Sequence, residues 1–385
     1  MNLASISLSA FLLANLVSMP SVLARSDSLL FCANDQTVTY ATREMIFLEN
    51  PRLGSISLID LDATPPAAST IQSIPCSVIG PPTSIARVPN RPMIVVTCAM
   101  RSQKINNRWQ HIPNRKVSLL SFDSTQKLEL LDQIEVGLQP TGLSFHPDGK
   151  HAYIANRADG TVSLIRVDQR TLKEVTRFKI AKPTDSLAHI ELSPDGRHAL
   201  ATLQQAGETI LLEIQDNLAL RIVQRIPSGP SPYSVRINRD GKWAVIADVS
   251  ANTLTLLDLQ GSPATITQQI QVGNLPEGID ISPDGEWIVV NCMEGANIAN
   301  KEHPLYGQPA RLYLIKRNNA GEIRVHSSQT TTGAPQFALF TPDGRKLVVS
   351  HTRLRTLSTL TFNNGQLTDT GHRIPVDGEP VAACR

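Results

Sequence analysis

The sequence lacks most of the features that identify common functional classes. Aromatic residues make up only 4% of the chain, and 36 basic side chains nearly balance 34 acidic ones over 385 residues. Such a chain carries no electrostatic footprint for nucleic acid and no polybasic membrane surface. The Gly-x-Ser-x-Gly, His-Glu-x-x-His, P-loop and dinucleotide-binding motifs are also absent. We therefore expect no nucleic-acid partner, and no local motif points to a reaction.

Long hydrophobic runs are lacking too, apart from one short segment near the N-terminus. Residues 6–17 are apolar but too few to span a bilayer, and residues 22–24 fit the small-residue rule for signal peptidase. We expect residues 1–24 to be a signal peptide and the mature protein to be periplasmic or secreted, with no membrane span. The segment contains no lysine or arginine, so an unstructured or strand-adding N-terminus is the alternative. The absence of an Asn-x-Ser/Thr sequon fits a bacterial periplasm.

What the sequence does contain is a repeat marked by a Pro-Asp-Gly turn. Asp-Gly between two apolar runs is the strongest short-range hairpin signal, because both residues tolerate positive φ. Successive turns stand 44 to 59 residues apart, which suits one four-stranded propeller blade each. The six markers are Pro89 in a looser turn, Pro147, Pro194, Arg239, Pro283 and Pro342.

Each copy contains four predicted strands in the same order. A short apolar strand (GLSF, HIEL, SVRI, GIDI, FALF) leads into the turn, and a second strand (AYIA, ALAT, AVIA, WIVV, LVVS) follows it. A third apolar strand and a more polar fourth complete the copy. One such unit cannot bury its own hydrophobic face, so the copies must stack. We predict an all-β fold, a seven-bladed β-propeller of four-stranded antiparallel blades, as one domain over residues 25–385.

The seventh blade is split between the two ends of the chain. Residues 28–62 supply a second and a third strand, and the missing first strand is found at residues 378–384. We expect this C-terminal strand to pair into the first blade and close the ring, which removes exposed sheet edges. Closure would bring Cys384 near Cys32, either as a disulfide in an oxidising compartment or as two small buried side chains. The five cysteines include no Cys-x-x-Cys, and we predict no metal site.

The copy QPTGLSFHPDGKHAYIAN resembles the YVTN repeat of the lactonase-like seven-bladed propellers, and weaker copies cover nearly the whole mature chain. That group includes lactone-ring hydrolases and cycloisomerases, haem-carrying propellers, dehydrogenase subunits and proteins without known activity. Its lactonase-type members carry Arg-His on a first strand and Asn-Glu at the end of the next. This chain has Thr141-Gly142 and Asn156-Arg157 there, and only His189, in the following copy, matches the histidine.

The predicted binding site is a mouth of the central channel. The first strand of each blade begins at the face where the second strand ends, so these ends converge around one opening. Most residues at these ends are polar or ionisable in an otherwise apolar repeat, as in a pocket with convergent polar groups. Two long connections, residues 101–111 and 293–306, should overhang the same mouth. The expected ligand-binding residues are Asn156, Arg157, Asp248, Tyr233, Arg101 and Glu277.

Three residues are candidates for catalysis at this mouth. His351 would be a general base or a haem ligand, or else a histidine bonded to a neighbouring loop. Glu294 would be a general acid or base if desolvated, or else a solvated loop carboxylate. Arg353 would hold an anion through paired donors.

These residues leave three hypotheses open. The first is a non-enzymatic, exported, monomeric propeller that binds a small anionic ligand or a periplasmic protein at the mouth. The second is a lactone hydrolase or isomerase that uses His351, Glu294 and Arg353. The third is a haem carrier with His351 as the ligand; otherwise we expect no cofactor.

Overall fold

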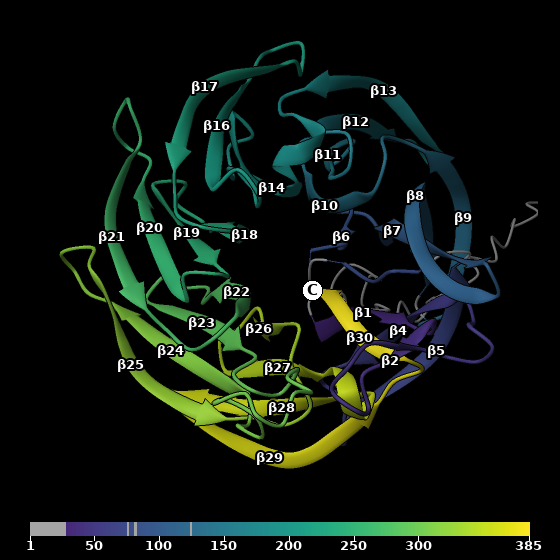
Figure 1. Cartoon of the computed structure of the whole chain (residues 1–385). Helices are drawn as coiled ribbons and strands as arrows, with labels where there is room; N and C mark the ends of the chain where they lie inside the picture. Colours follow the sequence, from purple (N-terminus) through teal and green to yellow (C-terminus); the bar gives the residue numbers. More distant parts are fainter. Residues whose placement is uncertain (1–27, 75–76, 81–82, 124) are drawn as a thin grey trace, which may run out of the picture.

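The computed structural model of the chain is a ring of seven four-stranded antiparallel sheets around a central channel (Figure 1). The structure describes residues 28–74, 77–80, 83–123 and 125–385. The seven-bladed propeller predicted from the repeats is therefore confirmed. The expected signal peptide, residues 1–24, lies outside the described residues. No helix among the described residues is long and apolar enough to cross a membrane.

The blades follow one another in chain order, with the inner strand named first in each. Blade 1 contains β30 (Glu379–Cys384), β1 (Leu29–Asp35), β4 (Gly54–Asp60) and β5 (Ala67–Ile74). Blade 2 contains β6 (Ile85–Arg87), β7 (Met93–Ile105), β8 (Arg108–Phe122) and β9 (Leu128–Glu135). Blade 3 contains β10 (Pro140–Phe145), β11 (His151–Asn156), β12 (Thr161–Val167) and β13 (Leu172–Lys179).

The remaining four blades repeat the pattern. Blade 4 contains β14 (Leu187–Leu192), β15 (His198–Leu203), β16 (Glu208–Ile214) and β17 (Leu220–Pro227). Blade 5 contains β18 (Pro232–Ile237), β19 (Trp243–Asp248), β20 (Thr253–Asp258) and β21 (Thr265–Gln271). Blade 6 contains β22 (Pro276–Ile281), β23 (Trp287–Cys292), β24 (Arg311–Arg317) and β25 (Ile323–Thr330). Blade 7 contains β26 (Ala338–Phe340), β27 (Lys346–His351), β28 (Thr356–Asn363) and β29 (Gln366–Pro375). Two 3-10 turns, η2 (Pro183–Asp185) and η3 (Thr352–Leu354), complete the elements.

The Asp-Gly turns act as the sequence predicted. The turn glycines have positive φ, for example 66° at Gly149 and 71° at Gly196, which a residue without a Cβ adopts without strain. The preceding aspartate binds the backbone of its own turn: Asp148 Oδ1 accepts hydrogen bonds from the amides of Lys150 (2.8 Å) and His151 (3.0 Å). Each turn joins an inner strand to a second strand that is almost wholly buried between neighbouring blades. The turns therefore mark one face of the ring, which we call the turn face.

The ring closes as expected, because β30 pairs antiparallel with β1 in blade 1. The register places Cys32 opposite Ala383 and Phe31 opposite Cys384. Since side chains alternate between the faces of a sheet, this offset of one residue sends the two thiols to opposite faces. Both cysteines are free, and each packs in a different apolar cluster. The expected disulfide is therefore not formed, and Cys32 is a buried and Cys384 a partly buried small side chain.

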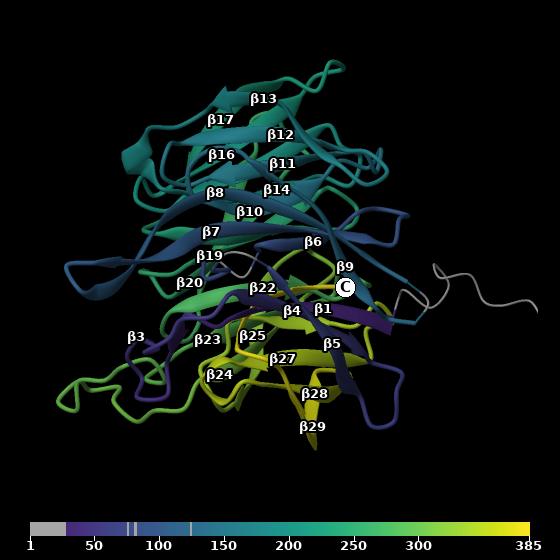
Figure 2. The same cartoon turned by 90° about the vertical axis from the view of Figure 1, so that its right-hand side faces the viewer.

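Three insertions stand out from the opposite face, which we call the insert face. Two of them were expected, although residues 101–111 form the tip of a long β7–β8 hairpin rather than a loop. The third, residues 36–53 between β1 and β4, was not predicted. It includes the small sheet of β2 (Val38–Thr39) and β3 (Ile46–Phe47). Figure 2 shows all three on the same side of the ring.

Candidate functional site

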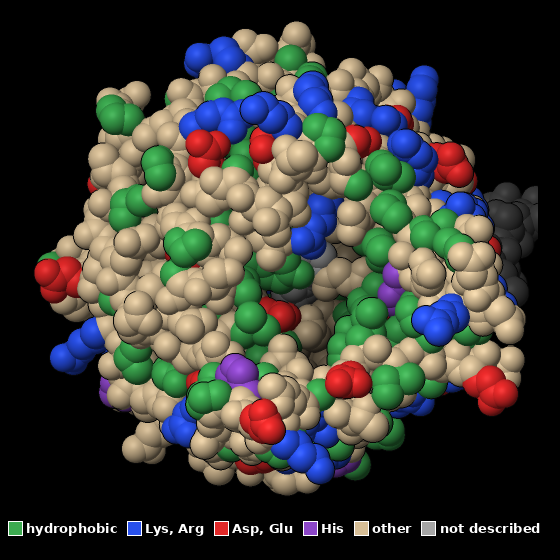
Figure 3. Space-filling view, in the orientation of Figure 1, with side chains coloured by type: hydrophobic (Ala, Val, Ile, Leu, Met, Phe, Trp, Pro, Cys, Tyr) green, Lys and Arg blue, Asp and Glu red, His purple; other side chains and the backbone are tan. Residues whose placement is uncertain are grey.

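The centre of the insert face is hollowed, and both basic and acidic side chains are visible at the hollow (Figure 3). Inner strands begin here and second strands end here, as the repeat implies. The hairpin β2–β3, the β7–β8 tip and the blade-6 insertion, residues 293–310, stand beside it on blades 1, 2 and 6. This is the mouth at which the sequence places a site.

A cluster of tyrosine and carboxyl side chains gathers at this mouth. Tyr40, from the blade-1 insertion, lies within electrostatic reach of Asp35, Tyr233, Glu277 and Glu379. Burial, and then these neighbouring groups, raise the pKa of Tyr40 above its usual range. The phenol is therefore protonated at neutral pH and able to donate a hydrogen bond.

Glu277 is the most chemically versatile member of the cluster. It is the second residue of the inner strand β22, where an inner strand enters the mouth. Burial raises the pKa of its carboxyl from 4.5 to about 7, against the opposing effect of a hydrogen bond with the Gln336 side chain. A carboxyl group with a pKa near neutrality exchanges protons readily in both directions, as a general acid or base must.

Tyr233 lies within electrostatic reach of Glu277, and Arg157 lies beside Tyr233. Burial, followed by the charge of Glu277, raises the pKa of Tyr233. The Arg157 guanidinium carbon lies 6.0 Å from the centre of the Tyr233 ring. Arg157 is held by hydrogen bonds from Nε to Ser186 Oγ (2.7 Å) and from Nη2 to Gln204 Oε1. Three ligand-binding residues predicted from the sequence, Arg157, Tyr233 and Glu277, thus meet in one place.

Glu379 is a second buried acid in the cluster. Its side chain is wholly inaccessible to solvent, and the Arg355 Nε atom lies 3.8 Å from its Oε1 atom. Oε1 also accepts a hydrogen bond from the Tyr40 amide at 3.3 Å. Oε2 has no hydrogen-bond partner among the residues that the structure describes. Burial raises the pKa of this carboxyl.

The blade-1 insertion is tied to both of its neighbours across the mouth. Arg353 donates to the carbonyl oxygens of Tyr40 (3.0 Å) and Ala41 (3.1 Å), and its Nη1 atom to that of Ala296 (3.3 Å). On the other side, the Thr37 hydroxyl and the His111 Nε2 atom share a hydrogen bond of 2.7 Å. Arg353, a proposed catalytic residue, therefore holds the backbone of two insertions together.

The other predicted residues lie away from the cluster or face into the blades. His351 Nδ1 bonds the Thr332 carbonyl and Nε2 bonds Ser358 Oγ, both at 2.8 Å, so both ring nitrogens are engaged within blade 7. Glu294 turns back onto blade 6, where Oε1 accepts the Tyr313 hydroxyl at 3.0 Å. Arg101 is exposed on the β7–β8 hairpin.

Asn156 and Asp248 end their second strands but are fully buried. Asn156 Nδ2 donates to Thr161 Oγ1 (3.0 Å) and Ser163 Oγ (2.8 Å) inside blade 3. Asp248 Oδ2 accepts the Thr255 hydroxyl at 2.5 Å inside blade 5, and burial raises its pKa to about 7. Among the described residues, no three His, Cys, Asp or Glu side chains are grouped as metal ligands.

Sequence reasoning missed Tyr40 because it overlooked the blade-1 insertion. A signal was present: second and third strands are joined by residues 157–160, 204–207 and 249–252 in blades 3 to 5, but by residues 36–53 in blade 1. Residues 28–62 predict both strands of blade 1, and the length of the segment between those strands is the signal of the insertion.

The matching family model and three matching curated relatives are described as lactonases. Residues 116–271 match the family model described as "Lactonase, 7-bladed beta-propeller". The chain is 26% identical over 176 residues to a 6-phosphogluconolactonase of Erwinia tasmaniensis, covering 42% of this chain and 53% of the relative. It is 28% identical over 148 residues to a 6-phosphogluconolactonase of Formosa agariphila, covering 36% and 42%. The chain thus spans about half the length of the curated relatives it matches.

Solved structures share the fold along nearly the whole chain. A putative 6-phosphogluconolactonase from Bacteroides fragilis superposes with a TM-score of 0.71 at 17% identity, covering 93% of this chain and 98% of the other. A periplasmic gluconolactonase from Pseudomonas aeruginosa gives a TM-score of 0.67 at 17% identity, covering 92% and 98%. Identities this low show the fold alone.

Proposed function

We propose that this seven-bladed β-propeller, of which residues 116–271 match a lactonase family model, hydrolyses the ring ester of a small sugar-type lactone at the mouth on the insert face. The single observation that carries the proposal is Glu277, a half-buried carboxyl whose pKa is raised to about 7, beside Tyr233. The named lactonases among the relatives support the same reaction class.

Glu277 would transfer the proton in both halves of the reaction. As a carboxylate it removes a proton from a water molecule while the water oxygen bonds to the lactone carbonyl carbon. The bond from that carbon to the ring oxygen then breaks, and Glu277 returns the proton to the ring oxygen. The product is the open-chain hydroxy acid, and Glu277 is again ionised. General acid-base catalysis of this kind contributes typically ~10²–10⁴-fold in rate.

The neighbouring phenols would stabilise the charge that develops on the carbonyl oxygen. Tyr233 and Tyr40 both have raised pKa values and are therefore protonated donors at neutral pH. Donors that are already oriented before the reaction stabilise an oxyanion without reorganisation. Arg157, anchored through Ser186 and Gln204, adds a positive charge beside the Tyr233 ring.

This proposal moves the catalytic role from His351, Glu294 and Arg353 to Glu277. Those three side chains are engaged in contacts with the protein itself. Haem ligation by His351 would require breaking a hydrogen bond on one of its ring nitrogens. A purely ligand-binding or partner-binding role is less well supported than hydrolysis, because the named relatives are lactonases.

We also propose that the protein is exported and loses residues 1–24. The disulfide at Cys98 supports this, because disulfides persist mainly in oxidising compartments. Mass spectrometry of the protein from its native host would show a mature chain that begins at Arg25, whereas an intact Met1 would contradict export.

Turnover of lactones by the purified protein tests the enzymatic proposal. We expect hydrolysis of 6-phosphogluconolactone or glucono-δ-lactone above the spontaneous rate, and a loss of about 10³-fold in kcat for Glu277→Gln. The control is Glu302→Gln, which neutralises an exposed acid in the blade-6 insertion and should leave kcat unchanged. No turnover of either lactone, or full activity in Glu277→Gln, would overturn the proposal.

A further inference from the structure

The channel has a second polar cavity at its other end, toward the turn face. It has a volume of about 340 Å³ and is lined by the ends of the inner strands. In the repeat, the residue three positions before each turn marker lines this cavity. In blades 2 to 7 that position holds Ala86, Ser144, Glu191, Arg236, Asp280 and Leu339.

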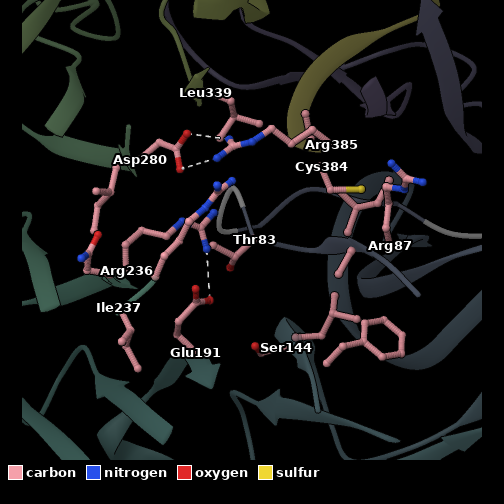
Figure 4. Close-up of a pocket in the computed structure, with 18 of the residues that line it drawn as sticks. Thr83, Arg87, Ser144, Glu191, Arg236, Ile237, Asp280, Leu339, Cys384 and Arg385 are labelled. Atoms are coloured by element: carbon pink, nitrogen blue, oxygen red, sulfur yellow. Dashed lines mark hydrogen bonds and ion pairs between the residues drawn. The ribbon is translucent and has the colours of Figure 1, made fainter. Parts of the chain in front are cut away.

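Three consecutive blades place a charged residue at that position. Arg236 Nη1 donates to Glu191 Oε2 at 3.2 Å. Arg385, just beyond β30, donates from Nη1 to Asp280 Oδ2 at 2.6 Å, across the ring from blade 1 to blade 6. Figure 4 shows both guanidinium groups pointing into the same cavity. Charged groups in a channel wall are costly to desolvate, which favours a role beyond packing.

Positive charge predominates in this cavity. Its lining side chains include four arginines but only two acids. The four arginines are Arg87, Arg236, Arg239 and Arg385. Within the described residues, Glu191 is the only side chain that accepts a hydrogen bond from Arg236. A guanidinium group has five N–H donors in a planar fork, so further donors remain for a carboxylate or phosphate.

Buried polar atoms near the cavity also lack partners. Thr83 Oγ1 lines the cavity and makes no hydrogen bond with the described residues. His189 Nε2, outside the lining but 3.8 Å from the lining residue Glu191 at Oε2, also makes no hydrogen bond with the described residues. Buried polar atoms in native proteins nearly always have a partner, so a molecule bound in the cavity would explain the Thr83 hydroxyl.

We propose that this cavity is a binding site for a small organic anion bearing a carboxylate or phosphate group, held between Arg236 and Arg385. The volume suits a molecule the size of a sugar acid. Asp280 and Glu277 are three residues apart on β22, so the two ends of the channel are separated by about 10 Å. The inference does not depend on lactone hydrolysis at the insert face.

Isothermal titration calorimetry of the full chain with inorganic phosphate and with D-gluconate, at low salt, tests the proposal. We expect at least one of them to bind, with the affinity reduced about tenfold in Arg236→Gln and in Arg385→Gln. Arg166→Gln is the matched control, because Arg166 also pairs with an acid, Asp168, but on the exposed outer surface. It should bind as the unaltered protein does.

The two anions distinguish the possible sources of the ligand. Binding of phosphate alone indicates a phosphate ester, binding of gluconate alone indicates a carboxylate, and binding of both indicates recognition by charge. If Arg236→Gln fails to fold by circular dichroism, Arg236→Lys keeps the charge and loses the planar fork, and it should weaken binding several-fold. Absence of binding of either anion, or equal affinity in all folded variants, would overturn the proposal. Lactone turnover should persist in the arginine variants, so the two proposals fail independently.

Discussion

The two ends of the channel are formed by the same seven inner strands but differ in the neighbours of their carboxyl groups. At the insert face, Glu277 and Glu379 lie among tyrosines, and burial raises the pKa of both carboxyls. At the turn face, Glu191 and Asp280 are each paired with an arginine. The cluster at the insert face includes Tyr40, which comes from an insertion outside the repeat. The charged residues at the turn face, Glu191, Arg236 and Asp280, occupy one equivalent position of neighbouring repeats.

This difference teaches that burial alone does not decide what a carboxyl group does in this protein. Burial raises the pKa of Glu277 and of Glu191 alike, and Glu277, which lies beside Tyr233, suits proton transfer. An acid bound to a guanidinium group instead orients that group and leaves its spare donors for a ligand. Four predictions separate the two situations, from the largest expected effect to the smallest.

The largest effect is expected for Asp248, a buried acid near the insert face whose hydrogen bonds come from threonine hydroxyls. Burial raises its folded pKa to about 7 from 3.8. The stability it contributes is therefore full below pH about 4 and is lost as pH rises through about 7, a change of about 4 kcal/mol. Asp248→Asn should remove that loss. Urea unfolding at pH 4 and pH 8 measures it, with exposed Asp168→Asn as control; equal pH dependence in Asp248→Asn and the unaltered protein would contradict it.

The next effect concerns the pH dependence of the two ends. If Glu277 is the base, kcat/KM should rise about tenfold per pH unit up to about pH 7 and then level off, which gives roughly 50- to 100-fold between pH 5 and the plateau. Gluconate binding at the turn face should instead strengthen as pH falls, because burial raises the pKa of Glu191 and its protonation leaves Arg236 unopposed. Rate and calorimetric titrations over the same pH range compare them. If kcat/KM and gluconate affinity changed in the same direction with pH, the assignment of Glu277 as the base and of Glu191 to the anion site would be refuted.

A smaller effect is expected when the blade-1 insertion is loosened. Arg353→Ala removes the hydrogen bonds to the carbonyls of Tyr40, Ala41 and Ala296. Tyr40 would then be less well positioned, and we expect KM for a lactone to rise about tenfold with anion binding at the turn face unchanged. Arg101→Ala, which removes an exposed arginine of another insertion, should change neither. An unchanged KM in Arg353→Ala would show that the insertion does not order the site.

The smallest effect is expected for His351, which serves blade 7 rather than either end. His351→Ala breaks hydrogen bonds to the Thr332 carbonyl and to Ser358 Oγ. The free energy of unfolding should fall by about 1 kcal/mol, while kcat at pH 7 stays within twofold. Thermal unfolding and initial rates decide this. A large loss of kcat with unchanged stability would return His351 to the catalytic set.

Sequence reasoning reached the site in part, and the reason lies in strand geometry. Glu277 and Tyr233 begin inner strands, and the mouth is where inner strands begin, so their level along the channel followed from the repeat. Asn156, Asp248 and His351 were assigned to the same level, but their side chains bond within their own blades. These three residues end second strands, and both faces of those strands are buried between neighbouring blades, so their side chains bond inside the blades although their backbone reaches the level of the mouth.

The sequence also did not predict the side-chain orientation of the two cysteines or of the charged residues at the turn face. The split blade predicted that β30 would lie beside β1, yet one residue of register separated Cys32 from Cys384. Glu191, Arg236 and Asp280 occupy equivalent positions of neighbouring copies, but nothing in a single copy showed that their side chains would share a cavity with Arg385.

The sequence by itself determined the ring: apolar strands and Asp-Gly turns repeat because each blade must bury its faces against the next. The tertiary structure alone decided which charged side chains meet. Glu277 meets Tyr40, and Asp280 meets Arg385, only because closing the ring brings residues far apart in the chain to one axis. There, the packing of each blade sets the face of every side chain, and a periodic sequence does not encode that choice locally.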